Sequence, residues 1–211
     1  MGGFLSNIRL VVWTALAVGV VFLLYYAMTV KGFAFQDVAL WTALLRWTHV
    51  LSGLMWVGLL YYFNFVQIPN LPKIPEEHRG PAISKVIAPA ALFWFRWAAM
   101  ATLLTGLLLA FNQNYILQAL SLGAVGYGDA PAGTREVFIG IGMWLAIIMW
   151  FNVWFVIWPN QQKALNIADR YPDLAADAKA KAGRTAMLFS RANTFLSIPM
   201  LVAMTGVQTL G

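Results

Sequence analysis

Cysteine is absent from this chain of 211 residues, and charged residues are scarce. The missing thiol excludes disulfides, thiolate metal sites, a cysteine nucleophile and a covalently attached haem c. Only 10% of the residues are charged, whereas soluble domains carry about 25%. Since 61% of the residues are apolar, the composition predicts an integral membrane protein.

Long apolar runs predict an all-α integral membrane protein, a bundle of five transmembrane helices in a single membrane domain over residues 1–211. The runs are residues 10–30, 41–67, 88–111, 136–158 and 191–210. Each is about as long as the hydrocarbon core is thick, and a backbone in lipid satisfies its hydrogen bonds within a helix. The first run is longer than a signal-peptide core and lacks a convincing cleavage motif, so we expect it to be retained.

Lys and Arg are distributed unevenly over the segments that join these runs. Ten of them lie at the N-terminus, in residues 68–86 and in residues 159–191, against Lys31 and Arg135 on the opposite side. Because cytoplasmic segments are rich in Lys and Arg, we predict a cytoplasmic N-terminus and a periplasmic C-terminus, in a bacterial inner membrane. The same pattern accounts for the net charge of +6 without a nucleic-acid partner.

The second run carries Arg46 and His49 in apolar surroundings. On a helix, these two residues share one stripe with Gly53 and Trp56. Ionisable residues inside a membrane segment are costly and usually functional, and this stripe combines a cation, an imidazole, a gap and a large ring. It suits a buried planar cofactor, with His49 as metal ligand to haem b, or a proton relay. A histidine hydrogen-bonded between two helices is the alternative.

A second axial ligand does not follow from the sequence. The only other histidine, His78, lies among charged residues and is expected to be solvated. Methionines in the predicted spans are candidates but are also ordinary core residues; they are Met55, Met100, Met143 and Met149. A five-coordinate haem and a haem shared by two chains stay open.

Arg96 lies within the third run, between Trp94 and Trp97. A guanidinium can stack on an indole or pair with an anion. Since no acidic residue lies deep in any run, the expected partners are backbone carbonyls, water, a haem propionate or an anionic substrate. For Arg46, nearer the predicted outer face, the alternatives are lipid headgroups and a propionate.

The second and fourth runs share a pattern. The first copy consists of Trp56, Phe63-Asn64 and Pro69-Asn70, and the second of Trp144, Phe151-Asn152 and Pro159-Asn160. Both runs cross the membrane in the same direction, so this is a parallel repeat. We expect Asn64 and Asn152 at similar depth, bonding to neighbouring helices at about 0.6–2 kcal/mol per contact. The second copy lacks the histidine.

Four runs resemble the membrane domain of bacterial cytochrome c-linked urate hydroxylase, the urate oxidase N-terminal domain. They are residues 46–67, 92–97, 149–163 (MWFNVWFVIWPNQQK) and 190–200. In that family, further helices and a C-terminal cytochrome c domain follow, but this chain lacks the cysteines of a haem c motif. Residues 49–58 also resemble, more loosely, the haem-binding helix of membrane protoporphyrinogen oxidase and of copper-resistance D-type proteins, which share a histidine followed by Trp-x-Gly.

These observations favour the membrane module of an oxidoreductase or electron-transfer assembly. In this interpretation His49 ligates haem b or relays protons, Arg46 and Arg96 hold propionates or an anionic substrate, and a separate cytochrome c on the outer side accepts the electrons. No triad, carboxylate pair or metal-ligand cluster can be assembled from the sequence, so catalytic residues stay unknown. The alternative is a non-catalytic accessory subunit that packs against other membrane subunits of a respiratory or photosynthetic complex. A transporter is a third possibility.

Overall fold

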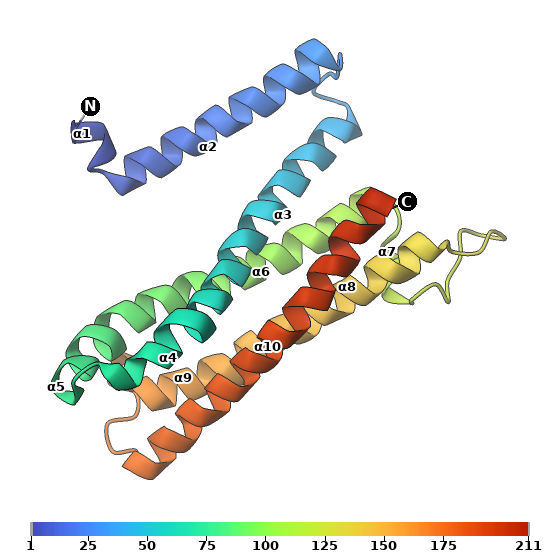
Figure 1. The fold of residues 1–211 in the computed structure, drawn as a ribbon. Helices are drawn as coiled ribbons and strands as arrows, with labels where there is room; N and C mark the ends of the chain where they lie inside the picture. Colours follow the sequence, from blue (N-terminus) through green and yellow to red (C-terminus); the bar gives the residue numbers. More distant parts are fainter. Residues whose placement is uncertain (1, 211) are drawn as a thin grey trace. The chain divides into compact units, whose positions relative to one another are not determined.

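The structure is a computed structural model that describes residues 2–210 (Figure 1). All named elements of the described residues are helical, and five of their helices are long and apolar enough to cross a membrane. These spans are Ile8–Val30, Val38–Lys73, Arg79–Asn112, Thr134–Leu165 and Ala176–Gly206. The structure thus confirms the all-α class and the five spans, whereas the orientation stays a prediction.

Four of the five spans, all but the first, are much longer than predicted. The second continues from α3 (Val38–Tyr61) through the π-helical η2 (Tyr62–Gln67) and α4 (Ile68–Asn70). The last, α10 (Ala176–Leu210), also contains the alanine-rich segment that the sequence placed outside the membrane run. Ala, Lys and Arg are strong helix formers, so this polar segment is helical and continuous with the apolar helix that follows it.

The chain divides into two compact units, Met1–Thr48 and His49–Gly211. The first contains α1 (Gly2–Leu5), α2 (Ile8–Tyr25), η1 (Tyr26–Val30) and the beginning of α3. Asn7 caps α2, because its Oδ1 accepts a hydrogen bond from the Leu10 amide at 3.3 Å. The indole of Trp41 on α3 donates a hydrogen bond at 2.9 Å to the carbonyl of Phe35, which lies in the segment between η1 and α3.

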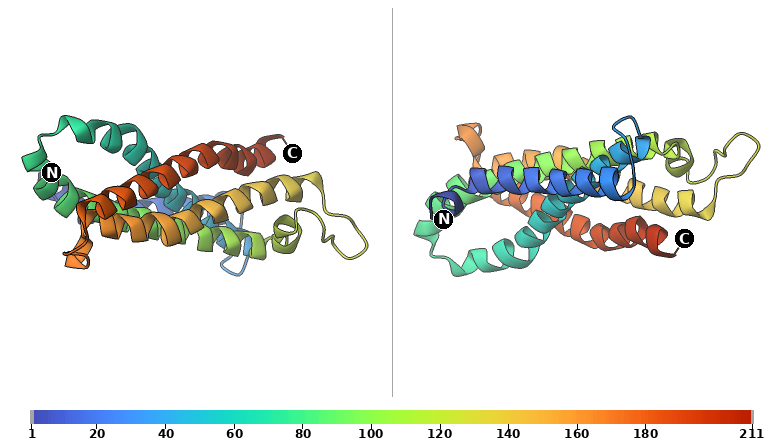
Figure 2. Two further views of the ribbon diagram at one scale, coloured as in Figure 1. Left: turned by 90° about the horizontal axis from the view of Figure 1, so that it is seen from below. Right: turned by 90° about the horizontal axis from the view of Figure 1, so that it is seen from above.

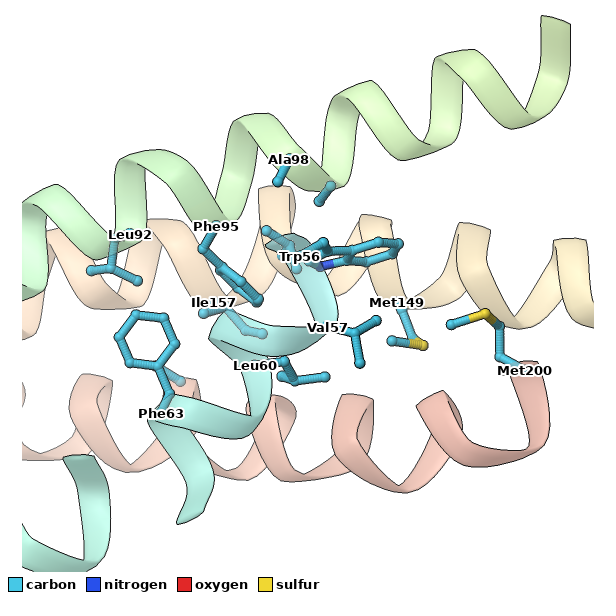
Figure 3. Packing of buried hydrophobic residues seen from close by; sticks show 13 residues of the cluster. Trp56, Val57, Leu60, Phe63, Leu92, Phe95, Ala98, Met149, Ile157 and Met200 are labelled. Atoms are coloured by element: carbon cyan, nitrogen blue, oxygen red, sulfur yellow. The ribbon is translucent and has the colours of Figure 1, made fainter. Parts of the chain in front are cut away.

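The second unit is built around one apolar cluster (Figure 3). It joins four rods: the end of α3, α6 (Ala88–Asn112), α8 (Thr134–Phe151) with its continuation η5 (Asn152–Ile157) and α9 (Trp158–Leu165), and α10. Phe63 and Phe95 meet edge to face, with 5.6 Å between their ring centroids. Helix α10 packs along α8, η5 and α9, and the segment between α7 (Ile116–Leu120) and α8 projects as an open loop (Figure 2).

Prolines follow widened turns in three helices of this unit, at two predicted helix ends and at the predicted beginning of the third run. The π-helical segments η2, η4 (Arg79–Ile87) and η5 each stop two residues before a proline, at Pro69, Pro89 and Pro159. Proline lacks an amide hydrogen and its ring clashes with the carbonyl four residues back, and a π-bulge removes that clash. The predicted ends at residues 67 and 158 are therefore wrong, because the helices continue beyond these prolines.

Candidate functional site

His49 belongs to α3, and its partly buried side chain lies against α6. Its Nδ1 is 3.0 Å from the carbonyl oxygen of Thr102 and 3.2 Å from the hydroxyl of Thr105. A carbonyl oxygen only accepts, so the proton of a neutral ring must be on Nδ1. The hydroxyl of Thr105 donates to the Ala101 carbonyl at 2.6 Å and therefore also accepts. This arrangement leaves the lone pair on Nε2.

Glycines bring α6 close to the imidazole. A Cβ at Gly106 would lie 2.9 Å from Cε1 of His49, so the ring packs directly on the backbone of α6. At Gly53, a Cβ would meet the Thr102 side chain at 3.7 Å, an ordinary contact. Of these two glycines, the predicted Gly53 therefore leaves space, and Gly106, which the sequence did not single out, permits the close approach.

Trp56, which the sequence placed on the same stripe, packs in the core and not around His49. Trp56 is 1% exposed and belongs to the apolar cluster of Figure 3; its Nε1 has no hydrogen-bond partner within residues 2–210. Arg46 is exposed and belongs to the first unit. The stripe is thus a helix face along which His49 meets α6 and Trp56 meets the core.

Arg96 makes a second, different contact. The centre of its guanidinium lies 3.3 Å from the ring centroid of Trp158 and 5.6 Å from that of Trp154. The sequence had suggested the neighbours Trp94 and Trp97, but these two indoles are 57% and 49% exposed. Adjacent residues on a helix point to different faces, so the stacking partners come from η5 and α9.

The contact that His49 makes with α6 lies apart from Arg96 on that helix. Arg96 precedes Thr102 by six residues, which corresponds to about 9 Å along a helix and to a different face. His49 contacts α6 from α3, whereas the Arg96 contact is with η5 and α9. Arg96 therefore does not belong to the histidine site.

A polar seam along α10 engages both predicted asparagines. Asn64 donates from Nδ2 to Ser190 Oγ at 2.8 Å and to the Leu60 carbonyl at 2.9 Å. Asn152 donates from Nδ2 to Asn193 Oδ1 at 2.8 Å. The two contacts lie within one turn of α10, so both asparagines bond to this helix at a similar level.

Metal ligands are few. The described residues contain no group of three or more His, Cys, Asp or Glu side chains that could hold a metal ion. His78 lies on α5 (Glu76–His78), is 68% exposed and has Glu77 at 3.5 Å. Met149 and Met143 are buried in apolar clusters. His49 fits the position of an axial haem ligand. A hydrogen bond from Nδ1 to a backbone carbonyl is the usual second interaction of a metal-binding imidazole.

Sequence reasoning missed Thr102, Thr105 and Gly106, and also Trp154, Trp158 and the seam residues Ser190 and Asn193. Each acts through a contact between elements far apart in the chain. A signal was present for the seam, because Ser190, Asn193 and Ser197 recur at helical spacing in an apolar run.

Residues 130–208 match the family model of the urate oxidase N-terminal domain. The matched segment includes α8, η5, α9 and most of α10, and so contains the asparagine pair and the two tryptophans that contact Arg96. It confirms the resemblance found in residues 149–163 and 190–200; His49 lies outside it. No curated protein and no solved structure matches the chain.

Proposed function

We propose that this chain is the membrane module of an oxidoreductase, in which His49 is an axial ligand to a haem b. The observation that carries the proposal is the bond from Nδ1 of His49 to the Thr102 carbonyl. This bond fixes the tautomer and the direction of the ring, and it makes Nε2 the atom available to a metal.

The family match supports an oxidoreductase-related domain. A haem bound here would supply one-electron transfer, with a potential set by its ligands and surroundings. The protein's own contribution is to hold the imidazole by Thr102 and Thr105 and to keep α6 close at Gly106. We propose that the electrons leave to a cytochrome c on the periplasmic side.

The test uses the two histidines as a matched pair. The full chain is produced with added haem, purified in mild detergent, and its Soret absorbance is measured per mole of protein. We expect a Soret band in the wild type, its loss in His49→Ala, and an unchanged band in His78→Ala, since His78 is exposed. A band that survives His49→Ala would overturn the haem assignment.

A positioning variant sharpens the same test. Thr105→Val removes the hydroxyl that accepts from Nδ1 but leaves the Thr102 carbonyl in place. We expect the haem to stay bound and its midpoint potential to shift, because second interactions of a ligating imidazole tune its basicity. A wild type that stays colourless yet co-purifies with other membrane subunits would favour the accessory role.

A further inference from the structure

Arg96 is a cation without a carboxylate partner in a membrane span. No Asp or Glu occurs in residues 78–128 or in residues 137–168, which include α6, η5 and α9. A charge in a low-dielectric region needs an opposite charge or strong dipoles, so the charge of Arg96 must be balanced by something other than a side-chain carboxylate.

The tryptophans fix the orientation of the guanidinium. Trp158 covers one face of it at 3.3 Å, and Trp97 and Trp154 form an edge-to-face pair beside it, with centroids 5.5 Å apart. The π face of an indole attracts the cation but accepts no N–H in the guanidinium plane. Within the part of the chain that the structure describes, Nε is buried and has no hydrogen-bond partner. The two terminal amino groups of the guanidinium are not among the buried atoms without a partner, and they are the donors through which it would bind an oxyanion by parallel hydrogen bonds.

The position of the contact along the chain indicates the source of that oxyanion. Trp158 ends the apolar part of its span, and after Pro159 the residues Asn160 to Lys163 follow with polar side chains. Tryptophan is typical of the boundary between hydrocarbon and headgroups, where lipid phosphates lie. Trp97 is 49% exposed, so the cluster continues onto the outer surface of the helices, which faces lipid in a membrane-spanning chain.

We propose that Arg96, Trp154 and Trp158 form a binding site for the phosphate group of an anionic phospholipid. Arg96 binds the phosphate oxygens, Trp158 holds the guanidinium in place, and the acyl chains lie along the apolar surface beside Trp97. The site is independent of the haem proposal, because its residues contact one another and not His49.

The experiment measures lipid retained by the purified chain. Protein extracted in mild detergent is passed over a size-exclusion column, and its phosphatidylglycerol is quantified by mass spectrometry. We expect Arg96→Gln to retain about tenfold less of this lipid than the wild type, as the loss of a charge-assisted contact predicts. Arg191→Gln, which removes an exposed arginine of α10, is the matched control and should retain the wild-type amount.

Two further arms separate the possible outcomes. Arg96→Lys keeps the charge and should retain an intermediate amount, and Trp158→Leu, which keeps Arg96 but removes the stack, should also lose lipid; far-UV circular dichroism checks that both remain helical. Thermal stabilisation by inorganic phosphate is compared with stabilisation by phosphatidylglycerol micelles. Equal lipid retention in wild type and Arg96→Gln would overturn the proposal, and so would stabilisation by phosphate alone.

Discussion

The two halves of the internal repeat share one backbone feature, a π-helical segment before a Pro-Asn pair, but differ in which side chains are buried. In each half a π-helical segment of six residues ends two residues before a Pro-Asn pair: η2 before Pro69 and η5 before Pro159. Each asparagine that follows the proline donates to the carbonyl four residues back, at 2.7 Å from Asn70 and 2.8 Å from Asn160. The π-helical segment and the asparagine hydrogen bond that follows it therefore both occur in each half.

The aromatic residues of the pattern do not repeat in the same way. Trp56 and Phe63 are 1% and 7% exposed, whereas Trp144 and Phe151 are 43% and 51% exposed. Proline follows Asn64 after five residues but follows Asn152 after seven, and two extra residues rotate a helix by about 200°. The same sequence pattern thus places its aromatic residues in the core in the first half and on the exposed surface in the second.

The asparagines differ in how fully they are bonded. Asn152 and Asn193 form a chain that ends on the Met149 carbonyl at 2.9 Å. In the first half, Asn64 Oδ1 is buried and without a partner among residues 2–210. Of the two asparagines, the one in the half that carries His49 therefore keeps a buried polar atom unsatisfied.

The largest effect is expected where the second half packs by backbone contact. A Cβ at Gly140 of α8 would overlap the carbonyl oxygen of Ala119 on α7, and overpacking costs about 1–3 kcal/mol or more. Gly140→Ala should therefore destabilise the protein strongly in an SDS titration followed by circular dichroism. In the first half, Gly58→Ala is the control: nothing in the described chain lies within 4 Å of that Cβ. Equal losses in both variants would contradict this contrast.

The next effect concerns the two asparagines. Asn152→Ala removes a donor to Asn193, which is fully buried, and should lower the free energy of unfolding by about 1–2 kcal/mol. Asn64→Ala should lower it less, because that side chain already leaves its Oδ1 unsatisfied. The measurement is the same SDS titration on both variants, and a larger loss for Asn64→Ala would contradict this order of the two asparagines.

A smaller effect is expected at the histidine, which only the first half possesses. Gly106→Ala places a methyl group 2.9 Å from Cε1 of His49, and the ring can rotate away at about 1 kcal/mol. Hydrogen exchange at the imidazole Nδ1, measured by NMR, should then be faster, because its bond to Thr102 is strained. Gly53→Ala, with its ordinary 3.7 Å contact, should leave that exchange rate unchanged.

The smallest effect is expected at the exposed tryptophan of the second half. The indole of Trp144 donates to the Leu120 carbonyl at 2.9 Å, which ties α8 to the end of α7. Trp144→Phe removes this bond from a partly exposed site and should lower stability by about 0.5–1 kcal/mol. An unchanged midpoint in the SDS titration would show that this tie contributes nothing.

Apolar runs of membrane length and the scarcity of charge determined the all-α class, the five spans and the recurrence of asparagine before Pro-Asn, because these depend on local hydrogen bonding and on hydrophobicity. The motif 149–163 also sufficed for the resemblance that the family match confirms over residues 130–208. Only the tertiary structure decided that the prolines widen helices and that His49 bonds to Thr102. It also placed Trp158, not Trp94 or Trp97, on Arg96. Such contacts depend on how helices are rotated against one another, and a shift of one residue in register turns a side chain by about 100°, which a single sequence does not fix.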